Sequence, residues 1–374
     1  MPVGFSSPCR WQHPGHPQPK SGDDAIMLDE QVLFQSGTLG YHTFRIPALL
    51  TLSSGRVLAF AEGRVHGPGD AGTIELVLRR SDDHGTSWSD LQVVVKEADM
   101  TCGNPCPVQD RATGTIWLWF CKNTAEGGEG LIVQGKAKRT VWLTHSLDDG
   151  DNWSEPVDMT DRVMQPDWTW YATGPGHGIQ LQTGRMIVPC DHMVGIHLDR
   201  TKDPYHSHVV FSDDGGATWH IGGIVRDGTN ECEVVELLNG DVMINCRNYA
   251  DRSQRAVAIS RDLGSSFEEF RWDQALIEPV CQASIVRWPQ ADNGLLFANP
   301  ASATDRTRMT VRHSTDEGFS WPRAKLLHAG PAAYSDLAVS AEGTALCLYE
   351  RGIDGPRETL TLARFNTNWL AEAP

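Results

Sequence analysis

Aspartates recur at regular positions in five short segments of this chain, and carboxylates in such arrangements can bind divalent cations. Their spacing is not that of an EF-hand loop, and the chain has no His-Glu-x-x-His segment of the kind that binds zinc. Its nine cysteines include no Cys-x-x-Cys pair and no zinc-like spacing to histidine. The sequence therefore predicts no metal site and no cofactor, which leaves any chemistry to the side chains of the chain itself.

The recurring aspartates belong to a turn pattern, Ser-x-Asp-x-Gly-x-(Ser/Thr)-(Trp/Phe), called the Asp box below. Complete copies lie at 81–88, 212–219, 260–267 and 314–321, and a fifth copy at 146–153 has Asn152 in the seventh position. The aspartate of such a turn can accept backbone N–H bonds, and the glycine permits a positive φ. The aromatic residue is expected to pack back over the hairpin. We expect these residues to be structural rather than to contact a substrate.

The segments before the Asp boxes are predicted to be strands. Each box follows a short run rich in β-branched or apolar residues, which indicates a strand that enters a tight turn. Successive boxes begin 65, 66, 48 and 54 residues apart, and this spacing fits one four-stranded blade of a β-propeller. Five boxes plus unmarked sequence predict an all-β fold, a six-bladed β-propeller that forms a single domain over residues 25–374. The His- and Pro-rich segment 1–24 is predicted to be a flexible tail.

The charge balance restricts the kind of partner. The chain of 374 residues carries 32 Lys and Arg against 48 Asp and Glu, a formal net charge of −16. This balance argues against a protein that binds nucleic acid or a membrane surface, and it means that an anionic substrate would need a local basic cluster.

The sequence also bears on location. No apolar run approaches the roughly 18 residues that cross a bilayer, and residues 1–24 lack the apolar core of a signal peptide. The odd number of cysteines, several of them in apolar segments, fits small buried hydrophobes. We expect a reduced, cytoplasmic protein, with secretion as the alternative if a leader has been removed.

The Asp boxes occur together with the segment YHTFRIPALL, which contains Phe44-Arg45-Ile46-Pro47. In this combination the chain resembles the sialidase (neuraminidase) superfamily, from about residue 40 to residue 352. One Asp box alone is weakly diagnostic, because unrelated propellers carry it, but five boxes after a Phe-Arg-Ile-Pro segment are a strong signal. The resemblance implies an exo-α-sialidase that hydrolyses terminal α-linked sialic acids from oligosaccharides, glycoproteins or glycolipids. It also implies retention of configuration through a covalent tyrosyl-sugar intermediate.

The resemblance implies that three arginines hold the carboxylate of the sugar, and they are Arg45, Arg247 and Arg306. Planar guanidinium groups bind carboxylates with geometric as well as electrostatic specificity. Glu350 is similar to the glutamate that orients the first of these arginines in the family. For Arg308, two residues beyond the third, a surface position is expected.

The resemblance also implies that Tyr334 is the nucleophile and Glu231 its base. Most glycosidases use paired carboxylates, and sialidases with a tyrosine nucleophile are an exception. Charge offers a reason, since the anomeric carbon carries a carboxylate that would repel an anionic attacker but not a neutral phenol. A nearby glutamate can accept the phenolic proton during attack. Glu233 would share a strand face with Glu231, and the choice between them rests on the resemblance.

The general acid and base is expected to be Asp70, which lies in a glycine-rich loop. A carboxylic acid in such a loop could move and lose hydration, which would raise its pKa towards neutrality. The resemblance implies that Arg64 contacts the region of the ring hydroxyls, with Glu62 as its support. Asp110 and Gln282 are expected to form walls of the pocket.

Asp191, His192 and Met193 stand where animal relatives carry tyrosines near the glycerol tail of the sugar. This difference leaves open whether the substrate is N-acetylneuraminic acid or a deaminated or shorter ulosonic acid. Two further alternatives are a sialyl-transferring relative and a noncatalytic propeller that binds glycans or proteins. A noncatalytic propeller would not be expected to hold the tyrosine, the two acids and the three arginines together.

Overall fold

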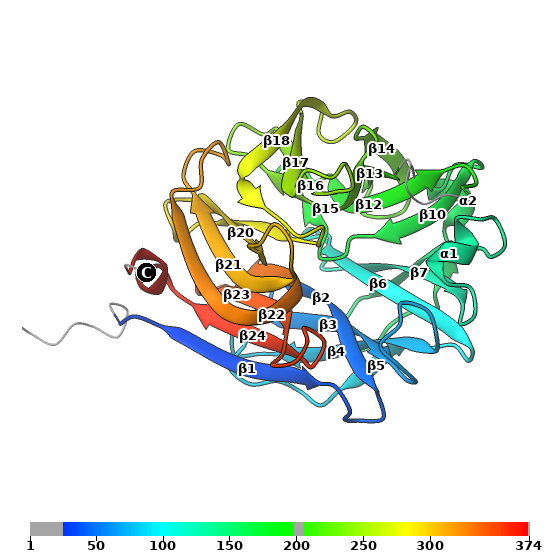
Figure 1. Cartoon of the computed structure of the whole chain (residues 1–374), viewed down its shortest axis with the longest axis horizontal. Helices are drawn as coiled ribbons and strands as arrows, with labels where there is room; N and C mark the ends of the chain where they lie inside the picture. The colour runs from blue at the N-terminus through cyan, green and yellow to red at the C-terminus, as the bar shows by residue number, and fades with distance from the viewer. Residues whose placement is uncertain (1–24, 198–204, 373–374) are drawn as a thin grey trace, which may run out of the picture.

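The protein is described by a computed structural model that covers residues 25–197 and 205–372, so the tail predicted over residues 1–24 lies outside the described residues (Figure 1). Within these ranges the regular elements are strands in four sheets and three short helices. The helices are α1 (Glu129–Ile132), α2 (Thr160–Val163) and α3 (Thr367–Ala371). No helix of the described ranges is long and apolar enough to cross a membrane. The all-β class predicted from the sequence is confirmed.

The largest sheet has eight strands in the order β2-β3-β4-β6-β7-β8-β9, with β5 paired to β4. Its first four strands are β2 (Thr43–Thr51), β3 (Val57–Arg64), β4 (Ile74–Ser81) and β5 (Gln92–Val95). The next four are β6 (Met100–Gln109), β7 (Ile116–Thr124), β8 (Thr140–Ser146) and β9 (Val157–Asp158). The two halves meet through one parallel bridge, Ile74 to Thr101, whereas all the other pairings in this sheet are antiparallel.

Two smaller sheets follow in the middle of the chain. The five-stranded sheet contains β10 (Trp168–Thr173), β11 (Ile179–Gln180), β12 (Met186–Val194), β13 (Tyr205–Ser212) and β14 (His220–Ile224). The four-stranded sheet contains β15 (Thr229–Glu236), β16 (Val242–Asn248), β17 (Gln254–Ser260) and β18 (Glu268–Ile277). Figure 1 shows the strands arranged in chain order around the molecule, with the colour passing from blue through green and yellow to red.

The last sheet joins strands from both ends of the described chain. It contains β19 (Ser284–Trp288), β20 (Gly294–Pro300), β21 (Thr307–Ser314), β22 (Arg323–Val339), β23 (Ala345–Arg351), β24 (Thr359–Phe365) and β1 (Leu28–Gln35). β1 pairs antiparallel with β24, so that Leu28 lies opposite Phe365. The long strand β22 pairs with β21 through its first part and with β23 through its second part.

The Asp boxes form the turns that their sequence predicts. The strands β4, β8, β13, β17 and β21 each end on the serine of a box. In the first box the backbone N–H and the hydroxyl of Ser87 donate to Asp83 at 2.7 and 2.6 Å, and Gly85 has a φ of 85°. The other four aspartates accept a matching pair from the backbone and side chain of the seventh residue, which in the box at 146–153 is Asn152 with its side-chain amide as donor. Because these contacts stay within eight residues, a local pattern is sufficient to specify them.

The apolar core lies between neighbouring groups of strands. One cluster packs Val57 and Ala59 of β3 against Leu346 and Leu348 of β23. The eight cysteines of the described ranges are buried and free of disulfides, and several belong to these clusters, as Cys106 does. Buried free cysteines act as small apolar residues, as the sequence predicts.

Candidate active site

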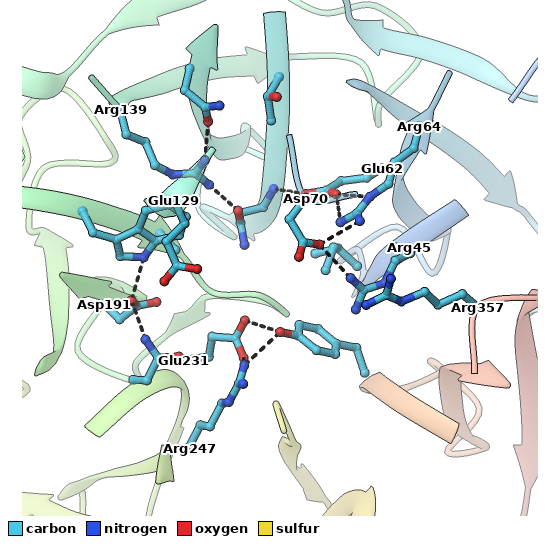
Figure 2. A pocket seen from close by; sticks show the side chains of 18 of the residues that line it. Arg45, Glu62, Arg64, Asp70, Glu129, Arg139, Asp191, Glu231, Arg247 and Arg357 are labelled. Atoms are coloured by element: carbon cyan, nitrogen blue, oxygen red, sulfur yellow. Dashed lines mark hydrogen bonds and ion pairs between the residues drawn. The ribbon is translucent and has the colours of Figure 1, made fainter. Parts of the chain in front are cut away.

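The predicted residues gather around a cavity of about 220 Å³, which Figure 2 shows from close by. Eight of them line it: Arg45, Glu62, Arg64, Asp70, Glu231, Arg247, Arg306 and Tyr334. They come from strands that lie far apart in the chain, from β2 to β22, and from the loops beside them. The walls are mainly charged side chains and amides.

The strands around the cavity share a local irregularity. The pairing registers are interrupted between Arg45 and Ala48 in β2, Gly103 and Cys106 in β6, Thr229 and Cys232 in β15, and Ala332 and Ser335 in β22. Such bulges turn a side chain away from the regular alternation of a strand and are common beside active sites. Glu231 and Tyr334 both lie within an interruption. Ile46 has a φ of 57°, a conformation that isoleucine rarely adopts and that marks strain at this edge of the cavity.

Tyr334, Glu231 and Arg247 form one hydrogen-bonded group. The Tyr334 hydroxyl donates to Glu231 Oε1 at 2.5 Å, and Arg247 Nη1 donates to Glu231 Oε2 at 2.6 Å and to the Tyr334 oxygen at 3.0 Å. Burial raises the pKa of Tyr334 well above its usual value, and the charge of Glu231 raises it further. The phenol is therefore neutral at rest and lies beside a carboxylate that can accept its proton.

The arginines lie around the Tyr334 ring. The guanidinium carbons of Arg45 and Arg306 lie 5.0 and 5.6 Å from the ring centroid. Glu350 is fully buried and accepts a hydrogen bond from Arg45 Nε at 2.9 Å, which is the support that the resemblance implies. Burial alone would lower the pKa of Arg45, but its carboxylate partners raise it above the usual range. Arg308 is exposed and does not line the cavity.

Asp70 is paired with two arginines at the mouth of the cavity. Its Oδ1 accepts hydrogen bonds from Arg45 Nη1 at 2.8 Å and from Arg64 Nη1 at 2.7 Å, and its side chain is 72% exposed. Lost hydration raises the pKa of Asp70, but the positive charges of Arg45 and Arg64, with a smaller contribution from Arg357, outweigh this and leave the pKa below its usual value. The expectation of a raised pKa is therefore wrong for this state. Glu62 accepts from Arg64 Nη2 at 2.6 Å, as a supporting residue would.

Asp110 and Gln282 do not line the cavity, and the prediction that they form its walls is wrong. Asp110 lies in a turn, where it accepts a hydrogen bond from Gln180 Nε2 at 2.8 Å. Gln282 is buried beside β22 and bonds to both backbone groups of Ser335, at 3.0 Å to the N–H and 2.9 Å to the carbonyl. It therefore holds the residue next to Tyr334 rather than a substrate.

Besides Arg357, the cavity wall contains residues that the sequence analysis did not single out. They are Thr101, Asn104, Asn123, Glu129, Arg139, Trp170, Ala172, Asn230 and Tyr249. The guanidinium carbon of Arg139 lies 4.4 Å from the Trp170 ring centroid. Of this set, only Asn230 has a signal in the sequence, because it precedes Glu231.

Asp191 belongs to the same wall. It accepts hydrogen bonds from Trp170 Nε1 at 3.2 Å and from Asn230 Nδ2 at 2.9 Å, and burial raises its pKa well above the usual value (Figure 2). The two residues that follow it, His192 and Met193, do not line the cavity. His192 stacks on Trp168 with ring centroids 3.5 Å apart, and Met193 packs in an apolar cluster.

A buried polar cluster, formed by His177, Glu233, Ser284 and Asp336, lies next to the reactive residues along the same strands. Ser284 Oγ lies 2.8 Å from Glu233 Oε2 and 2.9 Å from Asp336 Oδ1, and His177 Nδ1 lies 2.8 Å from the same Asp336 oxygen. Burial raises the pKa of Glu233 well above its usual value, and the charge of Asp336 adds to the effect.

In the described ranges, this cluster contains the one set of histidine and carboxylate groups close enough together to hold a metal ion. Backbone N–H groups already donate to its carboxylates, from Leu49 at 2.6 Å and from Ile285 at 2.8 Å. The geometry therefore favours a hydrogen-bonded network that joins β15 to β22.

Comparison with known proteins identifies the family of the chain. The pattern of the BNR repeat-like domain family matches residues 55–347. The chain is 33% identical over 390 residues to an exo-alpha-sialidase of Aspergillus fumigatus, with 92% of each chain covered. It is also 33% identical over 378 residues to a sialidase of Micromonospora viridifaciens, which covers 95% of this chain but 56% of that protein. The chain belongs to the sialidase superfamily.

This sialidase-family chain is a glycoside hydrolase, and its fold matches that of solved relatives. It superposes on the Hadza microbial sialidase Hz136 with a TM-score of 0.81 and 28% identity, over 91% of this chain and 69% of that one. An intramolecular trans-sialidase from Ruminococcus gnavus gives a TM-score of 0.78 at 16% identity, which shows the shared fold alone. Sialidase structures are β-propellers, and the all-β fold of this chain matches them.

Proposed function

We propose that this protein is an exo-α-sialidase that hydrolyses terminal α-linked sialic acids from oligosaccharides, glycoproteins or glycolipids, with retention of configuration. The observation that carries the proposal is the hydrogen bond from Tyr334 to Glu231 beside three arginines that line the same cavity. A carboxylate held by these arginines would bring the anomeric carbon that bears it close to the phenol. A neutral attacker suits such a carbon because it avoids repulsion by the adjacent carboxylate.

The reaction would proceed in two displacements. In the first, Tyr334 Oη bonds to the anomeric carbon, its proton passes to Glu231, and the leaving oxygen takes a proton from Asp70 as its bond breaks. In the second, Asp70 takes a proton from water, the water oxygen bonds to the anomeric carbon as the bond from that carbon to Tyr334 Oη breaks, and the phenolate that leaves recovers its proton from Glu231. Two inversions at one carbon amount to retention.

The first displacement needs Asp70 in its protonated form, although its pairing with Arg45 and Arg64 favours the ionised form. The substrate carboxylate competes with Asp70 for Arg45, because both bind the same guanidinium group. Once Asp70 loses this partner, its pKa rises, since a nearby positive charge no longer stabilises the anion. Substrate binding would therefore prepare the acid for the step that follows.

The same proposal includes six propeller blades. The long strand β22 pairs with β21 on one side and with β23 on the other, as an element shared by two blades would. The turns of the Asp boxes pack closely on strands of other blades. A Cβ atom added to Gly150, in the turn after β8, would lie 3.3 Å from the Leu58 side chain of β3, and one added to Gly85, in the turn after β4, would lie 3.4 Å from the Leu346 side chain of β23. A closed ring of blades requires such a contact between the first blade, which contains β4, and the last, which contains β23.

Turnover of 4-methylumbelliferyl α-N-acetylneuraminide by the purified protein tests the activity, with Tyr334→Phe as the inactive control. Proton NMR of the first product should show the α-anomer, and initial release of the β-anomer would exclude the two-displacement scheme. Turnover of the deaminated sugar alone would identify the alternative substrate. Absence of turnover with both sugars would overturn the proposal.

A further inference from the structure

Arg357 lines the catalytic cavity but has no part in the reaction described above. It precedes β24, and Figure 2 shows its side chain extending towards Arg45 and Asp70. Its one hydrogen bond within the described ranges goes to the carbonyl of Pro68 at 3.4 Å, and none of the ion pairs found there includes it. At the mouth of the cavity, Arg357 is therefore a cation that forms no hydrogen bond or ion pair with a carboxylate of the described ranges, in a chain with a net charge of −16.

Electrostatics around Arg357 agree with this position. The charge of Arg45 and partial burial lower the pKa of Arg357 by more than the nearby charges of Asp70 and Glu350 raise it, so the two guanidinium groups lie near each other. Guanidinium groups stay charged at neutral pH even so. An anion bound beside Arg357 would reduce the repulsion between the guanidinium groups of Arg45 and Arg357, and the positive charge of Arg357 would attract it.

A groove adjoins the cavity at Arg357. It has a volume of about 350 Å³, and its lining includes Ser36, His42, Pro68, Arg357 and Glu358. Arg357 lines both the groove and the cavity, so the two meet at this side chain.

The one carboxylate of the groove is already occupied. Glu358 accepts hydrogen bonds from the backbone N–H groups of Ile353, Asp354 and Gly355, at 3.1, 2.7 and 3.0 Å. It closes its own loop and leaves Arg357 available to a ligand.

The position of the groove beside the loop of Asp70 indicates which part of the substrate it would hold. Asp70 donates its proton to the leaving oxygen in the proposed reaction, so the leaving group must lie on the side of Asp70. Pro68, two residues before Asp70, lines the groove, and its carbonyl accepts from both Arg64 and Arg357. The groove is thus lined in part by the loop that carries the acid, and it meets the cavity at Arg357.

We propose that Arg357 and this groove form a subsite for a leaving group that carries a negative charge, a carboxylate or a sulfate. The inference rests on the proposed sialidase function and names its preferred substrate class. A chain of two sialic acids presents such a carboxylate in the unit next to the scissile bond, and a sulfated oligosaccharide presents a sulfate. The planar guanidinium group pairs with either through two parallel hydrogen bonds.

The test compares Arg357→Gln with the unchanged enzyme on three substrates, by initial rates of release of the terminal sugar. The substrates are an α2,8-linked disialyl-lactose, a sulfated sialyl-lactosamine and 3′-sialyllactose, whose leaving group is neutral. Loss of one charge-assisted contact should lower kcat/KM about 10-fold or more on the charged leaving groups, and Arg357→Lys should recover part of it. The neutral substrate should lose little. Salt should weaken the preference of the unchanged enzyme but not that of Arg357→Gln.

The control is Arg351→Gln, an arginine paired with Glu30 at 2.9 Å outside the cavity, which should keep the preference for charged leaving groups. An equal loss on all three substrates would overturn the proposal, because Arg357 would then act on Asp70 or on the sugar carboxylate. Unchanged rates on all three would overturn it as well. A loss on one charged substrate only would assign the site to that anion. If the unchanged enzyme cleaves no sialoside, the proposed function itself fails, and the subsite fails with it.

Discussion

The hydroxyl of Tyr334 lies 2.5 Å from Glu231 Oε1, although 103 residues separate the two positions in the chain. The two side chains come from β22 and β15, and each lies where the regular pairing of its strand is interrupted. Two residues further along the same strands, Asp336 and Glu233 meet through Ser284. The reactive pair is therefore held in place by a second, fully buried contact between the same two strands.

Tyr334→Phe is expected to lower kcat/KM for sialosides by roughly 100-fold or more, since it removes both the nucleophilic oxygen and the proton that Glu231 accepts. The arginines remain, so binding of 2,3-didehydro-2-deoxy-N-acetylneuraminic acid, measured by calorimetry, should change little. Near-normal turnover in this variant would remove Tyr334 from the mechanism.

Asp70→Ala is expected to separate substrates by their leaving group. A methylumbelliferyl group leaves readily without protonation, whereas a sugar alcohol needs the acid. Activity on 3′-sialyllactose should therefore fall much further than activity on the fluorogenic substrate, as steady-state rates on both would show. Equal losses would assign Asp70 a structural role.

The lowered pKa of Asp70 also predicts the pH dependence of the unchanged enzyme. The proton-donating form is lost as the pH rises through this pKa, by about 10-fold per pH unit above it. In consequence, kcat/KM for 3′-sialyllactose should decrease as the pH rises from the acidic range, and more steeply than that for the fluorogenic substrate. A profile that increases over this range for the sugar substrate would contradict the assignment.

Replacement of Arg45, Arg247 or Arg306 by lysine should weaken catalysis, because the substrate carboxylate loses a bidentate partner that an ammonium group cannot replace. Loss of one charge-assisted contact lowers binding by about 10- to 150-fold, and lysine should recover only part of this. The measurement is kcat/KM for each variant. Arg308→Lys is the matched control, since that residue is exposed outside the cavity. If the control proves as damaging as Arg306→Lys, the third carboxylate contact is misassigned.

Glu233→Gln is expected to be tolerated, because the raised pKa of Glu233 keeps it protonated in the folded protein. In the unfolded chain it ionises near its ordinary pKa, so folding stability falls as the pH rises above that value. The glutamine variant lacks this proton and should lose less stability than the unchanged protein as the pH rises above the ordinary pKa of a glutamate, in denaturant titrations. Glu233→Ala removes the hydrogen bonds with Ser284 and the Ile285 N–H, so it should destabilise the folded protein at every pH. An equally steep decline in Glu233→Gln would show that Glu233 is ionised.

Several features of this protein follow from its sequence alone. The Asp boxes specify their turns because Ser81, Asp83, Gly85 and Ser87 contact one another over a few residues, where local geometry decides the outcome. The all-β class follows from the strands that lead into them. Eight of the side chains that line the cavity, Arg45 and Tyr334 among them, were identified through the resemblance of short segments to a known family.

The tertiary structure decided what depends on distances between strands. Asp70 has a lowered pKa because Arg45, 25 residues away in the chain, lies 2.8 Å from it. The glycine-rich loop in the sequence does not indicate that such a partner is present. Gln282 faces a backbone instead of the cavity because β22 passes beside it. Arg139 and Arg357 reach the site from loops without any pattern of their own. Electrostatic and packing interactions act through space, so the neighbours that set each side chain's role exist only once the strands are assembled.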